Sequence, residues 1–172
     1  MILGELSPKS LWIKNPIDVL CEHDCKGGIV VADGKIVELV PTGKTPAADI
    51  DTVFDASRLV LLPGLINTHH HFYQTLTRAF SGSLNKGLFP WLSTLYPVWA
   101  NLRPDDISIS SKLAMVELLM SGCTTTVDHH YVFSDSLTDA IDIQIQEANN
   151  LGMRGVFTRG SMSLGKSKGC LL

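Results

Sequence analysis

The sequence lacks the features of nucleic-acid-binding, membrane-spanning and secreted proteins. Only 18% of its 172 residues are charged, the net charge is −3 and no basic run occurs, which argues against nucleic-acid backbone binding. The longest apolar stretch, Leu59 to Ile66, is interrupted by Pro63 and Gly64 and is too short to span a bilayer. The first five residues lack the basic segment and apolar core of a signal peptide. We therefore expect a cytoplasmic protein with neither nucleic-acid nor membrane partners.

Cysteine is also scarce, with four residues in the chain: Cys21, Cys25, Cys123 and Cys170. The segment from Cys21 to Cys25 includes His23 and could hold a metal ion, but no second Cys/His pair follows at the spacing of a structural zinc site. We interpret this segment as a polar loop with reduced thiols, and we expect Cys123 to lie in a core strand.

Histidine, by contrast, is concentrated. His69, His70 and His71 directly follow the apolar run from Leu59, which predicts a strand buried on both faces. Because side chains alternate along a strand, His69 and His71 should point the same way and His70 the other. Two imidazoles about 6–7 Å apart along a strand can reach one metal ion. The alternative is a polar cluster that caps the strand.

A second pair, His129 and His130, follows the β-branched run from Cys123 to Val127. Parallel strands that end side by side would bring both histidine clusters to the carboxyl edge of one sheet. In α/β folds this edge is where catalytic groups are placed.

The spacing of apolar and turn residues predicts two regions. Up to about residue 60 we expect short strands at 11–13, 28–32, 35–40 and 52–56, with Asp33-Gly34 as a hairpin turn. After His71 we expect a short helix at 72–80, an irregular aromatic-rich segment at 88–99, helices from Arg103 to Gly122 and at 136–150, and strands at 123–127 and 154–158. This alternation is typical of a parallel sheet with right-handed crossovers. Four apolar residues lie at helical spacing in the first long helix: Ile109, Leu113, Val116 and Met120. With only three strands present, we expect the helix face with Ile109, Leu113 and Val116 to stay uncovered.

Three segments together resemble the N-terminal part of amidohydrolase-superfamily enzymes: Asp33–Ile36, Leu62–Gln74 and Glu117–Asp128. The resemblance is strongest to the branch of cytosine/guanine deaminases and triazine hydrolases, and within it to the 8-oxoguanine deaminases. It covers nearly the whole chain, up to about Gly165. It implies an α/β fold: an incomplete TIM-like (β/α)8 barrel of about three β/α units over residues 61–172, preceded by a small β-sandwich segment over residues 1–60.

The resemblance also implies roles for individual residues. His69 and His71 match the first two metal ligands, and the metal would be zinc, with iron as the alternative. Gln74 matches a glutamine that binds the purine ring in guanine deaminases; otherwise it is an exposed helix residue. For His129 and His130 no ligand role carries over, so they either line the pocket or form hydrogen bonds at the strand end. The partners implied are a small heterocyclic substrate and, for the complete enzyme, further copies of the same chain.

The chemistry of the family needs residues that have no counterpart here. Such an enzyme hydrolyses a C–N bond with a metal-activated water and a carboxylate base, and its remaining ligands and acid/base residues lie on later strands. The catalytic residues are therefore unknown. Glu147, the last glutamate of the chain, should be solvated in mid-helix. A complete barrel takes roughly 250 residues. We therefore expect the N-terminal fragment of a metal-dependent aminohydrolase, inactive alone. The alternatives are another amidine or triazine hydrolase and a non-catalytic metal- or partner-binding module.

Overall fold

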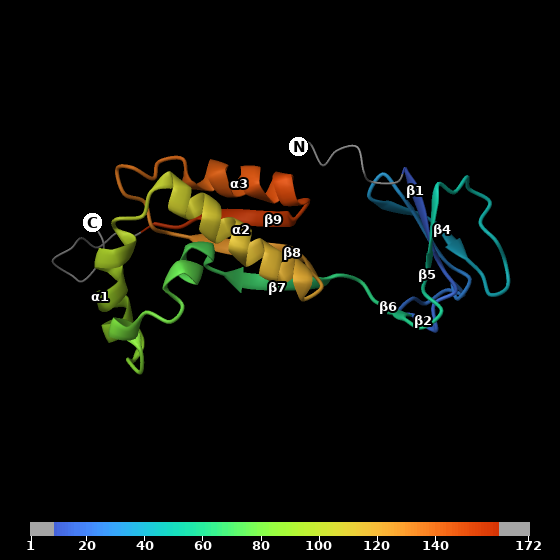
Figure 1. The fold of residues 1–172 in the computed structure, drawn as a ribbon, viewed down its shortest axis with the longest axis horizontal. Helices are drawn as coiled ribbons and strands as arrows, with labels where there is room; N and C mark the ends of the chain where they lie inside the picture. The colour runs from blue at the N-terminus through green and yellow to red at the C-terminus, as the bar shows by residue number, and fades with distance from the viewer. Residues whose placement is uncertain (1–8, 162–172) are drawn as a thin grey trace. The chain divides into compact units, whose positions relative to one another are not determined.

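The computed structural model describes residues 9–161 and divides into two compact units, Met1–Pro63 and Gly64–Leu172. Figure 1 shows the order of the elements along the chain. Each unit has its own sheet and its own buried residues, so the two are described separately. Cys170 lies outside the described residues.

The first unit is built around a four-stranded sheet in the order β4-β3-β1-β5. Its strands are β1 (Ser10–Lys14), β3 (Gly28–Ala32), β4 (Lys35–Val40) and β5 (Thr52–Asp55). β3 is antiparallel to both β1 and β4, whereas β5 runs parallel to β1. A separate parallel pair joins β2 (Asp18–Val19) and β6 (Val60–Leu61). The predicted strands of this region are confirmed.

The hairpin between β3 and β4 shows how the local sequence directs this sheet. Asp33 and Gly34 both have positive φ, at 49° and 72°, as a two-residue type I′ turn requires. Trp12, Val30 and Val40 then pack into a small core against Ile50. The predicted turn is confirmed.

The second unit contains a three-stranded parallel sheet in the order β7-β8-β9. The strands are β7 (Leu65–His70), β8 (Cys123–His130) and β9 (Arg154–Arg159), and they are connected by α2 (Pro104–Met120) and α3 (Ala140–Leu151). Between β7 and α2 the chain forms three shorter elements: η2 (Phe72–Thr77), η3 (Ser81–Ser83) and α1 (Leu88–Trp99). The predicted alternation of parallel strands and helices is confirmed, and α2 and α3 lie side by side (Figure 1).

Capping residues explain where α2 and α3 begin and end. Pro104 starts α2, and the Asp106 carboxylate accepts a hydrogen bond from the Arg103 backbone N–H (2.9 Å) at its first turn. Gly122 and Gly152, with φ of 85° and 70°, provide the left-handed residue that ends each helix. The predicted end of α2 is confirmed, whereas α3 begins at Ala140 rather than near Ser136, because turns occupy the intervening residues.

Two apolar clusters hold the second unit together. One gathers aromatic and aliphatic side chains from η2, α1, α2 and the segment after β8: Tyr73, Leu95, Trp99, Ile107, Val132 and Leu137. The other lies under α2 and α3 and contains Phe72, Ala114, Met115, Cys123, Ala148 and Met153. The expectation that Cys123 lies in a core strand is confirmed.

The run from Leu59 to Ile66 does not form one strand buried on both faces, and that prediction is wrong. Pro63 and Gly64 separate β6 from β7, and Leu65 and Ile66 are exposed. The physical reason is that β7 packs mainly against β8, and no helix of the described residues lies over its apolar side chains.

Two further predictions are corrected. Residues 88–99 form the regular helix α1, because packing of Leu95 and Trp99 into the core outweighs the two prolines of this segment. Glu147 is buried rather than solvated: it accepts a hydrogen bond from Ser108 (2.6 Å) and pairs with Lys112 (3.1 Å) between α2 and α3.

The Cys21–Cys25 loop has the free thiols that were expected, although Cys25 is buried. Burial also raises the pKa of the Cys25 thiol. Among residues 9–161, no helix combines the length and apolarity that crossing a membrane would need.

We predict that Gly64→Ala destabilises the chain by about 1–3 kcal/mol. Gly64 precedes β7, and a Cβ there would overlap the side chain of Thr124 on β8. Gly87→Ala is the matched control, because no atom lies within 4 Å of a Cβ at that position. Urea unfolding of the two variants measures the effect, and equal midpoints for both would contradict the close approach of Gly64 to Thr124.

Candidate functional site

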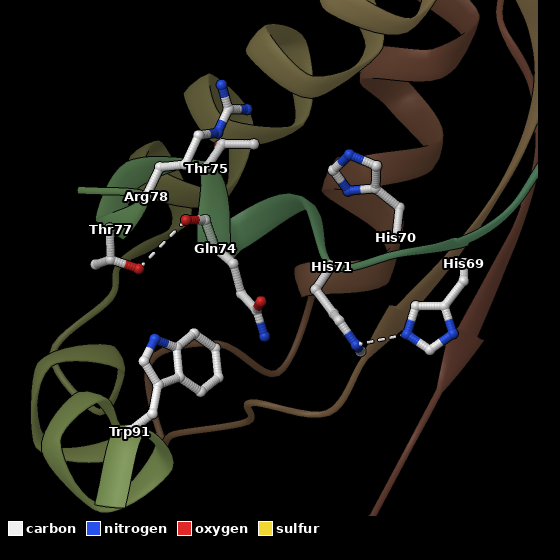
Figure 2. Close-up of a pocket in the computed structure, with 8 residues that line it drawn as sticks. All are labelled: His69, His70, His71, Gln74, Thr75, Thr77, Arg78 and Trp91. Atoms are coloured by element: carbon white, nitrogen blue, oxygen red, sulfur yellow. Dashed lines mark hydrogen bonds between the residues drawn. The ribbon is translucent and has the colours of Figure 1, made fainter. Parts of the chain in front are cut away.

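His69 and His71 meet at the carboxyl end of β7. Figure 2 shows their rings side by side on one side of the strand and His70 on the other, as the alternation of a strand requires. The two Nε2 atoms are 3.2 Å apart. The chain turns immediately afterwards into η2, which begins at Phe72.

A hydrogen bond determines which nitrogen of His71 carries the proton. Nδ1 of His71 lies 2.6 Å from the backbone carbonyl oxygen of His129. A carbonyl oxygen can only accept, so Nδ1 donates, and Nε2 of the neutral ring keeps its lone pair. Burial lowers the pKa of His71 and favours this neutral form. His71 therefore presents a free nitrogen lone pair toward His69.

The histidine pair fits a zinc ion. Tetrahedral zinc with bonds of about 2.0–2.1 Å separates two ligand nitrogens by about 3.3 Å, close to the 3.2 Å between these Nε2 atoms. Within residues 9–161, no group of three or more His, Cys, Asp or Glu side chains is placed to hold one ion. The described part of the chain thus brings two ligand-type nitrogens, Nε2 of His69 and Nε2 of His71, to one point.

His129 and His130 form hydrogen bonds at the end of β8. His129 supplies the carbonyl that holds His71, its own Nε2 lies 3.3 Å from the Thr68 carbonyl oxygen, and its ring is 4.8 Å from that of His69. His130 is buried on the other face and donates from Nε2 to the Val132 carbonyl (2.7 Å). Burial lowers the pKa of His130 to about 4, so the ring is neutral. The hydrogen-bonding interpretation of both residues is confirmed.

Asp128 is a residue of the candidate site that the sequence reasoning missed. Its buried carboxylate accepts one hydrogen bond from the backbone N–H of Phe72 (2.7 Å) and another from Nε2 of Gln144 (2.8 Å). The first bond joins the end of β8 to the residue that follows His71. Burial raises the pKa of Asp128 to about 6. The sequence signal that could have indicated Asp128 was its position directly before His129 and His130.

A cavity of about 340 Å³ adjoins the histidine pair (Figure 2). Its lining comes from the end of β7, from η2 with the residue after it, and from α1: His69, His70, His71, Gln74, Thr75, Thr77, Arg78 and Trp91. The structure therefore brings His69, His71 and Gln74 to one pocket. In Figure 2 the Gln74 amide lies between Trp91 and His71.

Trp91 was also missed, because it belongs to the segment expected to be irregular. Its ring packs edge-to-face against the buried Trp99, at 5.4 Å between centroids, which holds it at the pocket wall. Arg78 lies at the pocket edge and is held by two hydrogen bonds to the carboxylate of Glu117 on α2. The pocket thus combines an aromatic face, a primary amide, a guanidinium and three imidazoles.

The chain resembles known proteins over most of its length. The pattern of the Amidohydrolase family matches residues 60–170. An 8-oxoguanine deaminase from Pseudomonas aeruginosa is 56% identical over 162 residues, 93% of this chain and 36% of that protein. A 5-methylthioadenosine/S-adenosylhomocysteine deaminase from Syntrophomonas wolfei is 38% identical over 141 residues, 81% of this chain and 30% of that protein.

Solved structures resemble the chain as well. A triazine hydrolase from Arthrobacter aurescens superposes with a TM-score of 0.80 at 27% identity, over 93% of this chain and 37% of that one. The zinc complex of an atrazine chlorohydrolase from Arthrobacter aurescens TC1 superposes with a TM-score of 0.77 at 29% identity, over 92% of this chain and 37% of that one. The chain spans about a third of the length of these relatives.

We predict that at pH 4 Asp128→Asn preserves stability, whereas Asp128→Ala costs about 2–4 kcal/mol. An asparagine can still accept from the Phe72 N–H. If the Gln144 amide turns over, the asparagine amide can donate to Oε1 of Gln144, which has no hydrogen-bond partner in the native protein. Alanine leaves the Phe72 N–H and the Gln144 amide buried and unpaired. Urea titrations compare the two variants, and equal losses would contradict the assigned bonds.

A comparison of the native chain with Asp128→Asn also tests the pKa of Asp128. Between its ordinary pKa of 3.8 and the raised value of about 6, the folded state holds a proton that the unfolded state has lost. The contribution of Asp128 to the free energy of unfolding is therefore fully present below pH 4, and it falls as the pH rises to 6. Relative to Asp128→Asn, the native chain should lose on the order of 3 kcal/mol between pH 4 and pH 7 in chelator-treated buffer. If the difference in free energy of unfolding between the native chain and Asp128→Asn stays constant with pH, Asp128 is not desolvated.

Proposed function

The chain belongs to the amidohydrolase family, and we propose that it carries the first part of the active site of a metal-dependent aminohydrolase. The reaction would be hydrolysis of a C–N bond in a purine-like heterocycle such as 8-oxoguanine. One observation carries the proposal: His69 and His71 present their Nε2 atoms to one point, 3.2 Å apart, beside a pocket that holds an amide and an aromatic ring. The 56% identity to an 8-oxoguanine deaminase supports this substrate class.

The proposed fold of the complete protein follows from the two units. In this proposal β7, β8 and β9 with their helices are the first three β/α units of a (β/α)8 barrel, and the first unit is part of a β-sandwich. The likeness to a triazine hydrolase over 93% of the chain supports this proposal. The division between the units after Pro63 is close to the proposed boundary at residue 60.

His69 and His71 are the proposed zinc ligands, with iron as the alternative metal. His71 is suited to this role because its Nδ1 is occupied by the His129 carbonyl, which fixes the ring and leaves Nε2 free. The zinc in a structural neighbour supports the choice of metal. Zinc, when bound, lowers the pKa of a coordinated water to about 7, which makes hydroxide available at neutral pH.

Gln74 and Trp91 are the proposed contacts for the heterocycle. A primary amide donates and accepts hydrogen bonds, so Gln74 can pair with a ring that carries both an N–H and a carbonyl or ring nitrogen. Trp91 provides a flat apolar wall on which such a ring can stack. Both residues line the same cavity as the histidine pair, so a heterocycle held by them would lie next to the proposed metal ligands.

A triazine is the second candidate substrate, because the solved structures that resemble this chain include a triazine hydrolase and an atrazine chlorohydrolase. A triazine is also a flat, nitrogen-rich ring and would meet the same amide and aromatic groups. The two candidates differ in the leaving group and in ring size, so a direct comparison of turnover separates them.

We predict that zinc binds weakly to the 172-residue chain and that the binding depends on His69 and His71. Two protein ligands are fewer than the three or four of zinc sites. The double variant His69→Ala/His71→Ala should abolish the heat of zinc binding in titration calorimetry. His23→Ala is the control, since His23 is an exposed histidine of the first unit. Unchanged binding in the double variant, or loss of binding in His23→Ala, would place the metal elsewhere.

We predict that the 172-residue chain alone releases no ammonia from 8-oxoguanine. The described residues provide no third ligand, and each missing catalytic element typically costs a factor of ~10²–10⁴. Joining the chain to the remaining C-terminal part of the Pseudomonas aeruginosa deaminase should restore ammonia release.

Within this joined protein, His69→Ala should abolish turnover again, and Gln74→Ala should raise KM more than it lowers kcat. If chloride release from atrazine exceeds ammonia release from 8-oxoguanine, a triazine is the better candidate substrate. Turnover by the unjoined chain that disappears in His69→Ala would contradict the proposal that the site is only begun here.

A further inference from the structure

Two cysteine thiols meet in the loop between β2 and β3 of the first unit. Cys21 and Cys25 are four residues apart, and both are free. Their side chains form a hydrogen bond with each other. Among residues 9–161 no group of three or more possible metal ligands is formed, so a metal site does not account for the pair. The contact between these thiols is a feature that the proposed hydrolase activity does not use.

The loop that carries the two thiols is fixed at both ends. The backbone N–H of Leu20 donates to the carbonyl oxygen of Leu61 on β6, at 3.0 Å. At the other end, the N–H of Gly28 donates to the carbonyl oxygen of Cys25, at 2.9 Å. The two cysteines therefore follow and precede backbone positions that the strands of this unit already hold.

Hydrogen bonds inside the loop also restrict it. The Asp24 carboxylate accepts from the backbone N–H of Thr42 (3.2 Å) and from the Thr42 hydroxyl (2.8 Å). The backbone N–H of His23 lies 3.5 Å from the Cys21 sulfur, to which it donates. The folded loop thus keeps the two sulfurs together, and a bond between them would require no unfolding of the sheet.

The two thiols differ in accessibility. Cys21 is exposed, whereas Cys25 is only 2% exposed. Burial raises the pKa of the Cys25 thiol, and the neighbouring Cys21 thiol and Asp24 carboxylate raise it further. Dissolved oxidants react first with an accessible cysteine that can form a thiolate. Cys21 is therefore placed to meet an oxidant, and Cys25 is placed to react with Cys21.

We propose that Cys21 and Cys25 are a redox modification site, at which a peroxide converts the two thiols into a reversible disulfide. In the first step the Cys21 sulfur attacks one oxygen of hydrogen peroxide and the O–O bond breaks. Cys21 becomes a sulfenic acid, and the departing hydroxide leaves as water with the Cys21 thiol proton. In the second step the Cys25 sulfur displaces the sulfenic oxygen, which leaves as a second water with the Cys25 thiol proton. The two sulfurs lose two electrons in total, and the peroxide gains them.

Contact between the sulfurs favours the second step over competing reactions. Because Cys25 already lies against Cys21, its attack is intramolecular and needs no encounter with another thiol. A dithiol reductant returns the disulfide to two thiols by exchange. Disulfides that form and break in this way are the kind found in reducing compartments, where they are usually transient.

The first test maps the disulfide in a Cys170→Ser chain. After a slight excess of hydrogen peroxide, N-ethylmaleimide added in denaturant should label only Cys123. After reduction by dithiothreitol, the same reagent should label Cys21 and Cys25 as well. Cys123 is the internal control, because it is a free cysteine that is buried in the core of the second unit. Peptide mass spectrometry should locate the link within one chain.

Single variants separate the roles of the two thiols. Cys21→Ser should slow the loss of thiols to peroxide at least about tenfold, because the remaining Cys25 is shielded from solvent. Cys25→Ser should keep the native rate of the first step and stop at the sulfenic acid of Cys21, which dimedone traps. Circular dichroism checks that both variants are folded. Iodoacetamide, applied briefly to the native chain, tests the same order without any substitution and should label Cys21 before Cys25.

Three results would overturn the proposal. The first is labelling of both Cys21 and Cys25 after peroxide treatment without prior reduction. The second is a main product in which two chains are joined through Cys21, since the link would then not be made within the loop. The third is equal rates of thiol loss in Cys21→Ser and Cys25→Ser together with alkylation of Cys25 before Cys21, which would contradict the assigned order of attack.

Discussion

The hydrogen bond from Nδ1 of His71 to the carbonyl of His129 is the interaction on which the candidate site depends. It crosses from the end of β7 to the end of β8, and it fixes both the ring orientation and the protonation state of His71. Asp128 reinforces the same junction by accepting from the Phe72 N–H. Two neighbouring residues of β8 thus hold the backbone and the ring of the segment that leaves β7, and the Nε2 atoms of His69 and His71 converge as a consequence.

The rest of the pocket is arranged around this junction. η2 begins where the junction ends and carries Gln74, while α1 reaches the pocket with Trp91 because Trp99 is anchored in the core. The positions of these side chains follow from apolar packing far from the histidines. The inner side of α2 supports the sheet that positions the site.

Much of the local structure was predictable because its causes are local. The Asp33-Gly34 turn, the start of α2 at Pro104 and its end at Gly122 are set by the φ preferences of single residues. The alternation of His69, His70 and His71 follows from strand geometry alone. The extent of burial was not predictable in the same way. Leu65 and Ile66 were predicted to be core residues but are exposed on an edge strand. Glu147 was predicted to be solvated but is enclosed between two helices.

The sequence by itself determined the histidine pair, the parallel strand–helix alternation and the resemblance to amidohydrolases, because each depends on residue types at short spacing. Only the tertiary structure decided the roles of Asp128 and Trp91. Asp128 matters because 56 residues separate it from Phe72 in the chain and a hydrogen bond joins them in space. Trp91 matters because packing against Trp99 turns an apparently irregular segment into a pocket wall. Contacts between distant residues depend on how the elements pack, and that packing cannot be inferred from any short stretch of sequence.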